Sequence, residues 1–208
     1  MSFRKEEKIF FHKSSFLDLI KFLNKNNAKK LYPTRQIESI YFDNKFFQSY
    51  HDSEDSLVPR KKIRIRSYDN FLNCIFETKI TSVEGKFKKS NKITTKEFLS
   101  KINKGIYDKS YGLLYPVIKI SYLRKYFLIN NYLRITIDYD VKYCDYKRNN
   151  FFVIDKDSLI LEVKSDDNVL DDMIKNIIPF NRERVSKYCL GIDKLFNRTD
   201  GNRILINI

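Results

Sequence analysis

The chain has 208 residues and a formal net charge of +14, with 40 Lys and Arg against 26 Asp and Glu. Its length fits one domain, residues 1–208, and a hydrophobic fraction of 42% is enough for a core, which argues against a disordered chain. So large a positive excess opposes a compact fold unless the charges are spread out or meet an anionic partner. Candidate partners are a nucleic acid, an acidic membrane surface and a small polyanion; the alternative is a Lys-rich composition with solvated side chains.

Segments in which apolar and polar residues alternate dominate the chain and predict strands. In chain order they cover residues 3–11, 36–42, 61–68, 74–80, 117–127, 132–140, 150–154 and 159–165. Most of these segments follow one another directly, which does not suit βαβ units and favours a sandwich or a closed barrel. The predicted fold class is therefore α+β and mainly antiparallel β.

Helical spacing of apolar residues predicts three helices between the strands. The first begins at Ser14 or Ser15, and the second follows Thr94. The third covers residues 168–178, and Pro179 marks its end. We expect the apolar stripes of these helices to be buried in the core and not to form binding surfaces.

The three cysteines, Cys74, Cys144 and Cys189, are an odd number without paired spacing. This argues against a disulfide framework and a zinc site, and it is typical of a reducing compartment. The N-terminus lacks the apolar stretch of a signal peptide, and no apolar run approaches the length of a membrane span. We expect a soluble, cytoplasmic protein.

Charged residues alternate with apolar ones in the predicted strands and therefore share a face. In residues 61–68, Lys62, Arg64 and Arg66 lie on one face, opposite Ile63 and Ile65. Four other segments place Arg4, Glu6 and Lys8; Glu77 and Lys79; Arg134, Thr136 and Asp138; and Glu162 and Lys164 on their polar faces. One such strand is typical of an ordinary amphipathic sheet. Five strands with this pattern predict a positively charged interior if the sheet closes with these faces inward.

An empty interior of this kind would be unfavourable, because like charges would be partly desolvated together. A polyphosphate would relieve the repulsion, since Arg offers paired donors and Lys a compact charge to phosphate oxygens. Carboxylates on the same faces require a divalent metal between them and the phosphates, or an ion pair with a neighbouring base. The candidates are Glu6, Glu77, Asp138 and Glu162. The ion pair is favoured for Glu77 and Asp138, and the metal for Glu162.

Short motifs follow one another along most of the chain. They are Arg4-x-Glu6-x-Lys8, SIYFDN at 39–44, Lys62-x-Arg64-x-Arg66-x-Tyr68, Phe76-Glu77-x-Lys79, Tyr122-x-Arg124, Arg134-x-Thr136-x-Asp138, Leu161-Glu162-x-Lys164 and Ser186-Lys187-Tyr188. In this order they resemble the VTC (vacuolar transporter chaperone) domain, a branch of the triphosphate tunnel metalloenzymes. Where that family has a basic run after the F-E-x-K strand, this chain has Lys86-Phe87-Lys88-Lys89, so the register of this contact stays open.

The resemblance implies a closed eight-stranded β tunnel with a few flanking helices. It implies transfer of the γ-phosphoryl group of a nucleoside triphosphate, expected to be ATP, to a growing polyphosphate chain. The basic residues that would bind the triphosphate are Arg4, Lys8, Lys62, Arg64, Arg66, Lys79, Lys88, Arg124, Arg134, Lys164 and Lys187. A divalent cofactor, Mn²⁺ or Mg²⁺, would be held by Glu162, with Glu6 assisting.

Two other functions fit the same residues. The first is a triphosphatase, in which water replaces the polyphosphate acceptor. The second is a non-catalytic sensor of polyphosphate or inositol polyphosphates, which would not need the Glu162 carboxylate. Nucleic acid is not an expected partner, because acids on the basic faces would repel its phosphate backbone and most aromatic residues occupy apolar positions. A P-loop is absent from the sequence, and His12 and His51 are expected at the surface.

Overall fold

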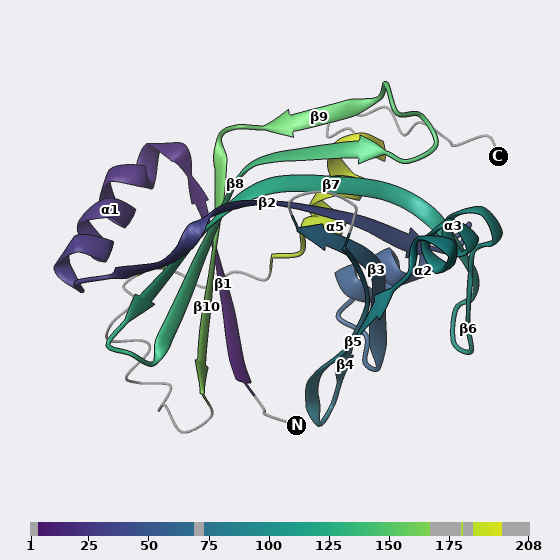
Figure 1. Ribbon diagram of the computed structural model, residues 1–208, viewed down its shortest axis with the longest axis horizontal. Coiled ribbons are helices and arrows are strands. Elements are labelled where there is room, and N and C mark those ends of the chain that lie inside the picture. The colour runs from purple at the N-terminus through teal and green to yellow at the C-terminus, as the bar shows by residue number, and fades with distance from the viewer. Residues whose placement is uncertain (1–3, 69–72, 167–179, 181–184, 197–208) are drawn as a thin grey trace. The chain divides into compact units, whose positions relative to one another are not determined.

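The computed structural model describes residues 4–68, 73–166, 180 and 185–196, apart from the side chains of 4–7 and 166 (Figure 1). The chain divides into two compact units. Unit 1 is formed by Met1–Gln36, Tyr122–Val141 and Asp155–Val185, and unit 2 by Ile37–Ser121, Lys142–Ile154 and Ser186–Ile208. Three long strands, β2, β7 and β8, contribute residues to both units.

Strands dominate the described residues. They are β1 (Arg4–His12), β2 (Lys29–Asp43), β3 (Arg60–Tyr68), β4 (Cys74–Ser82), β5 (Gly85–Ile93), β6 (Ile106–Asp108), β7 (Gly112–Ile129), β8 (Leu133–Asp145), β9 (Phe152–Asp155) and β10 (Ser158–Asp166). The helices are η1 (Lys13–Ser15), α1 (Phe16–Lys25), α2 (Gln48–Glu54), α3 (Thr95–Lys104) and α5 (Lys187–Phe196). The predicted strands and the first two predicted helices are therefore present, whereas the third predicted helix, 168–178, lies outside the described residues.

The strands form a ten-stranded sheet in the order β1-β10-β8-β7-β2-β3-β4-β5, with β6 paired to β7 and β9 to β8. The pairs of β1 with β10, β10 with β8, β2 with β3, β3 with β4, and β4 with β5 are all antiparallel. Since β1 and β5 end this order, hydrogen bonds do not close the sheet within the described part of the chain. The mainly antiparallel class is confirmed. The main path includes β5, which was not predicted, and the predicted strand 150–154 lies off this path as β9.

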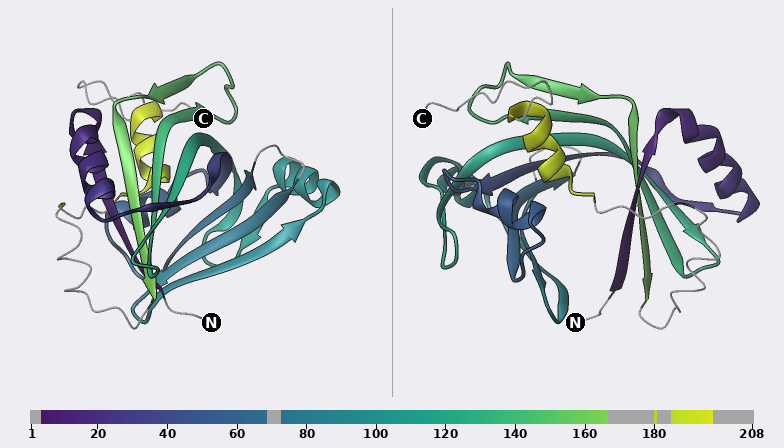
Figure 2. Two further views of the ribbon diagram at one scale, coloured as in Figure 1. Left: turned by 60° about the vertical axis from the view of Figure 1, so that its left-hand side comes forward. Right: turned by 180° about the vertical axis from the view of Figure 1, so that it is seen from behind.

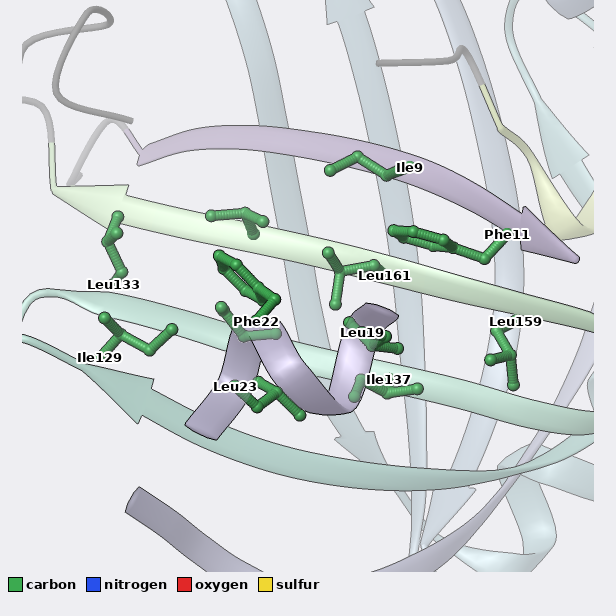
Figure 3. Close-up of a cluster of buried hydrophobic side chains, with 12 residues drawn as sticks. Ile9, Phe11, Leu19, Phe22, Leu23, Ile129, Leu133, Ile137, Leu159 and Leu161 are labelled. Carbon is green, nitrogen blue, oxygen red and sulfur yellow. The ribbon is translucent and has the colours of Figure 1, made fainter. Parts of the chain in front are cut away.

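Unit 1 has a core between α1 and one face of its strands (Figure 3). Leu19, Phe22 and Leu23 of α1 are buried there, at the spacing of one helix face. They pack on alternate residues of the strands; the strand residues of this cluster are Ile9, Phe11, Ile129, Leu133, Ile135, Ile137, Leu159, Leu161 and Val163. Because strand side chains alternate between faces, the intervening residues of β1, β8 and β10 point to the other side of the sheet.

Unit 2 has a separate core under β2, β3 and β4, formed by Ile40, Phe42, Ile63, Ile65, Cys74, Tyr111 and Leu114. Phe98 and Ile102 of α3 pack against this cluster, and Thr94 and Glu97 form a capping box that begins the helix. The hairpin of β4 and β5 and the C-terminal α5 also belong to this unit (Figure 2). No helix in the described residues is long and apolar enough to cross a membrane.

Four described elements of unit 2 were absent from the sequence prediction: α2, β5, β6 and α5. The helix α5 packs closely on β7 and β8 through Gly191. A Cβ atom there would lie 2.5 Å from Ile118 Cδ1 and 2.6 Å from Tyr143 Cδ1. Glycine is therefore required for this approach, and it fixes the position of the residues at the N-terminus of α5.

Candidate functional site

In unit 2, strand pairing gathers basic residues on the face of the sheet opposite the core. The register sets Lys62 opposite Lys79, Arg64 opposite Glu77, and Lys79 opposite Lys88. Residues paired across antiparallel strands point to the same side, so these side chains share one face. We call Lys62, Arg64, Arg66, Lys79 and Lys88 the cationic face. The alternation predicted for residues 61–68 is thus present. In β5, Lys86 and Lys88 lie on the side of the cationic face, whereas Lys89 lies opposite Thr78 on the other side.

Arg64 is the centre of the cationic face. It is 6% exposed, and its Nε donates to Glu77 Oε2 at 2.7 Å while its Nη1 donates to the Tyr41 hydroxyl at 2.8 Å. Glu77, 1% exposed, accepts a second hydrogen bond from Lys88 Nζ at 2.6 Å. Burial alone would raise the pKa of Glu77, but the charges of Arg64 and Arg66 and the bond from Lys88 lower it well below its usual range. Glu77 is therefore an ionised partner in an ion pair in this structure.

Arg66 adds a second buried guanidinium to the same face. Its Nε donates to the hydroxyl of Ser39 at 3.1 Å, a neutral partner supplied by β2. Among the described residues, Arg64, Arg66 and Lys88 surround the Glu77 carboxylate, so the described part of this cluster carries an excess of positive charge. An anion bound here would gain charge-assisted hydrogen bonds in a partly desolvated place.

The N-terminal end of α5 meets the cationic face through the motif Ser186-Lys187-Tyr188. Lys62 Nζ donates to Ser186 Oγ at 2.8 Å. The Tyr188 hydroxyl donates to Asp43 Oδ2 at 2.6 Å, and its ring stacks on that of Tyr41, with centroids 5.2 Å apart and planes 18° apart. This motif therefore lies beside β2 and β3, and Lys187, the first residue of α5, adds positive charge near Tyr41.

In unit 1 the polar side of the sheet carries a cluster of paired cations and carboxylates. Arg124 of β7 donates from Nε to Asp138 Oδ1 at 2.5 Å and from Nη2 to Asp138 Oδ2 at 2.7 Å. Its Nη2 also lies 3.5 Å from Glu162 Oε2, and Lys164 Nζ lies 2.6 Å from Glu162 Oε1. Burial alone would lower the pKa of Arg124, but Tyr122, Asp138 and Glu162 together raise it. Among the described side chains, Arg124 and Lys164 thus pair with the carboxylates of Asp138 and Glu162.

Oxygen atoms gather around Glu162 in unit 1. Glu162 pairs with Thr136 across β10 and β8, and Asp138 lies two residues further along β8 on the same side. The hydroxyl of Thr136 is buried and has no hydrogen-bond partner within the part of the chain that the structure describes. The described residues contain no group of three or more His, Cys, Asp and Glu arranged to hold a metal. Mg²⁺ and Mn²⁺ nevertheless need only one or two carboxylates beside phosphate oxygens, so these hard oxygen donors fit such an ion.

The remaining predicted site residues lie in unit 1. Lys8 pairs with Glu162 across β1 and β10, and its Nζ donates to the carbonyl of Val185 at 3.1 Å. Arg134 is exposed on β8, opposite Lys164. The backbones of Arg4 and Glu6 belong to β1, but their side chains lie outside the described residues. The predicted residues thus form two groups, each within one unit.

The sequence prediction missed the residues that hold the cationic face in place. Tyr41, Asp43 and Ser39 are all part of the SIYFDN motif, which was noted only as a resemblance. Their alternation in β2 could have placed them on one face, but their partners Arg64, Tyr188 and Arg66 become evident only from the pairing of β2 with β3 and the position of α5.

The VTC domain family model matches residues 3–112 and 106–196 of this chain. Among solved structures, an adenylate cyclase candidate from Bacillus halodurans is 14% identical, with a TM-score of 0.60, and covers 94% of this chain and 98% of its own. The PH1819 protein from Pyrococcus horikoshii OT3 is 12% identical, with a TM-score of 0.56, and covers 91% of this chain and 96% of its own. An adenylyl cyclase candidate from Hippeastrum, whose structure is described as revealing a dominant triphosphatase activity, is 13% identical. Its TM-score is 0.52, with 93% of this chain and 96% of its own covered.

These likenesses show the fold and confirm the predicted fold class. No protein with a curated description matches the chain. The family match spans the motifs that place Arg64, Arg66, Glu77, Arg124 and Glu162 in the two clusters.

Proposed function

The chain belongs to the VTC-domain family, and from this membership we propose that it is a metal-dependent polyphosphate polymerase. Residues 1–208 act as one domain that transfers the γ-phosphoryl group of a nucleoside triphosphate, ATP, to a growing polyphosphate chain. The observation that carries the proposal is the gathering of basic side chains on the cationic face, where, among the described residues, buried Arg64 and Arg66 and the more exposed Lys88 surround one carboxylate, Glu77. A structural ion-pair network would need no such gathering of cations.

A protein needs to perform little covalent chemistry in phosphoryl transfer, because the transition state of the reaction is loose and the negative charge is spread over phosphate oxygens. The required contributions are alignment of donor and acceptor and stabilisation of that charge. Arg64 and Arg66 offer guanidinium donors in fixed positions, because Arg64 is hydrogen-bonded to Glu77 and Arg66 to Ser39. Lys62, Lys79, Lys88 and Lys187 complete the binding of the polyanion. Within unit 1, we assign Lys8, Arg124, Arg134 and Lys164 to triphosphate binding as well, together with the predicted Arg4.

Glu162 and the Thr136 hydroxyl would hold the divalent ion, Mn²⁺ or Mg²⁺, with Glu6 as a predicted further ligand. When bound, the ion supplies positive charge between phosphate oxygens and carboxylates. Asp138 is less available, because Arg124 occupies both of its oxygens. In this arrangement Lys164 holds the Glu162 carboxylate in place through Oε1.

A triphosphatase is the second candidate function, favoured by the Hippeastrum neighbour. It would use the same cationic face with water as the acceptor. A sensor of polyphosphate or inositol polyphosphates is the third, and it would leave Glu162 without a role in metal binding. For each candidate the partners are nucleoside triphosphates and polyphosphate and not nucleic acid, and the three buried free thiols, Cys74, Cys144 and Cys189, support a cytoplasmic location.

The test is to incubate the purified protein with ATP and Mn²⁺ or Mg²⁺ and to resolve the products on a polyphosphate gel. Metal-dependent long chains would support the polymerase. Free phosphate without chains would replace it with the triphosphatase, and binding without turnover would replace it with the sensor.

Two adjacent lysines of β5 provide a matched pair of variants for the same assay. Lys88 lies on the cationic face and bonds Glu77, whereas Lys89 is an exposed lysine on the opposite side of the strand. Both changes, Lys88→Gln and Lys89→Gln, remove one charge from one edge strand. We expect the first to slow chain synthesis and the second to leave it unchanged. Equal effects would show that only net charge matters and would argue against a site on this face.

A further inference from the structure

Tyr41 is a buried phenol in the middle of the cationic face. It lies opposite Arg64 in the register of β2 and β3 and is 7% exposed. Its hydroxyl oxygen accepts a hydrogen bond from Arg64 Nη1 at 2.8 Å. A guanidinium can only donate, so this bond uses the oxygen as an acceptor and leaves the phenol's own hydrogen to be directed elsewhere.

The charged groups that surround the Tyr41 hydroxyl hydrogen are cations, which cannot accept a hydrogen bond. The charged groups around it are Arg64 and Arg66 of β3 and Lys187 of α5, and Glu77 of β4 is engaged by Arg64 and Lys88. Within the described residues no acceptor bonds the Tyr41 hydroxyl. A buried donor without an acceptor is unfavourable. An anion could accept the hydrogen bond of the Tyr41 hydroxyl and would be attracted by the three cations beside this hydroxyl.

Contacts with Tyr188 fix the position of the Tyr41 ring. The ring stacks on Tyr188, whose hydroxyl donates to Asp43. The same Asp43 carboxylate accepts the backbone N–H groups of Asn44 at 2.8 Å and Ser49 at 3.0 Å, at the start of α2. Tyr41 therefore holds one orientation before any ligand arrives, which lowers the entropic cost of binding.

We propose that Tyr41 is a binding residue for the polyphosphate substrate and donates its hydroxyl hydrogen to a phosphate oxygen that Arg64 also contacts. This inference rests on the proposed function for the identity of the anion. It adds to the expected set of Lys and Arg side chains a neutral donor, supplied by the SIYFDN motif. A neutral donor gives direction to the bound phosphate without adding to the repulsion among the cations.

The arrangement predicts a spectroscopic signature. Burial alone would raise the pKa of Tyr41, but the charges of Arg64, Arg66 and Lys187 outweigh burial and lower it. A bound polyanion offsets those charges and accepts the phenol hydrogen, so binding raises this pKa. Tyrosinate absorbance that develops in the free protein below the ordinary tyrosine pKa of about 10 should therefore decrease when the anion binds.

The experiment measures inorganic tripolyphosphate binding by calorimetry for the wild type, Tyr41→Phe and the control Tyr107→Phe. Tyr107 is 75% exposed on β6, and its replacement by Phe removes the same hydroxyl group from a tyrosine outside the cationic face. Tyr41→Phe keeps the stacked ring and loses only the hydroxyl, and we expect roughly tenfold to a hundredfold weaker binding, as for a lost hydrogen bond to a charged group. Tyr107→Phe should bind as the wild type does.

The pH titration of tyrosinate absorbance, with and without tripolyphosphate, is the second measurement. We expect the early-titrating signal in the wild type and in Tyr107→Phe, its loss in Tyr41→Phe, and its shift to higher pH with ligand. Unchanged affinity in Tyr41→Phe, or failure of the wild type to bind tripolyphosphate, would overturn the inference. The polymerase assay is independent: binding that depends on Tyr41 without chain synthesis would refute the polymerase and leave the role of Tyr41 standing.

Discussion

Replacing Asp138 by Asn should destabilise the protein without altering its response to metal. Asp138 is 0% exposed, and both of its oxygens accept from Arg124. Asn cannot balance the buried guanidinium, which would be left with Glu162 at 3.5 Å. Removing one partner of a buried pair costs about 3–5 kcal/mol. At about 2–4 °C per kcal/mol for a chain of this size, the melting temperature should fall by about 6–20 °C.

The assay is thermal unfolding of four proteins: the wild type, Asp138→Asn, Arg124→Met, and Arg124→Met combined with Asp138→Leu. The double variant removes both charges and should recover much of the loss, since paired buried charges replaced by apolar side chains are often neutral in stability. Each unfolding curve is repeated with Mn²⁺, which should raise the melting temperatures of the wild type and of Asp138→Asn equally. A loss below about 1 kcal/mol, or a metal effect confined to the wild type, would refute the ion-pair assignment and make Asp138 a metal ligand.

Three further changes test other parts of the site. Glu162→Gln should raise the metal concentration needed for activity more than it weakens tripolyphosphate affinity; an unchanged metal titration would leave Glu162 as an ion-pair partner. Because the folded-state pKa of Glu77 is lowered, its stabilisation is present above its unfolded pKa of about 4.3 and is lost as the pH falls further. Urea midpoints should therefore fall less steeply below about pH 4 in Glu77→Gln than in the wild type, and parallel curves would contradict this. Gly191→Ala should cost about 1–3 kcal/mol by overpacking α5 and should weaken tripolyphosphate binding with it, whereas unchanged melting would show that α5 can shift freely.

The elements that could be predicted are those whose alternation is complete. In β3 the apolar Ile63 and Ile65 separate three bases, so period-2 reasoning placed both the core and the cationic side of this strand. The strand β5 has the sequence GKFKKSNKI, in which lysines occupy both faces. Its extended form depends on pairing with β4, which no local pattern reveals.

Pairing across strands also limited what could be said of the site. The sequence shows that Glu77 and Asp138 share faces with bases, but not which base meets which acid. In the structure Glu77 forms ion pairs with Arg64 and Lys88, and Asp138 forms an ion pair with Arg124. These partners come from different strands, so their meeting is decided by strand order and register, which lie beyond single-strand periodicity.

Within the described residues β5 ends the strand order, which has a consequence for how the protein behaves at high concentration. An edge strand exposes unpaired N–H and C=O groups and can recruit a strand from another molecule. In β5 the lysines at 86, 88, 89 and 92 place like charges along this edge, so that two copies repel each other as they approach. The lysines of this edge, among them Lys88, which we propose to bind the polyanion, therefore also oppose aggregation. Polyphosphate in excess could remove that protection by bridging the edges of neighbouring molecules.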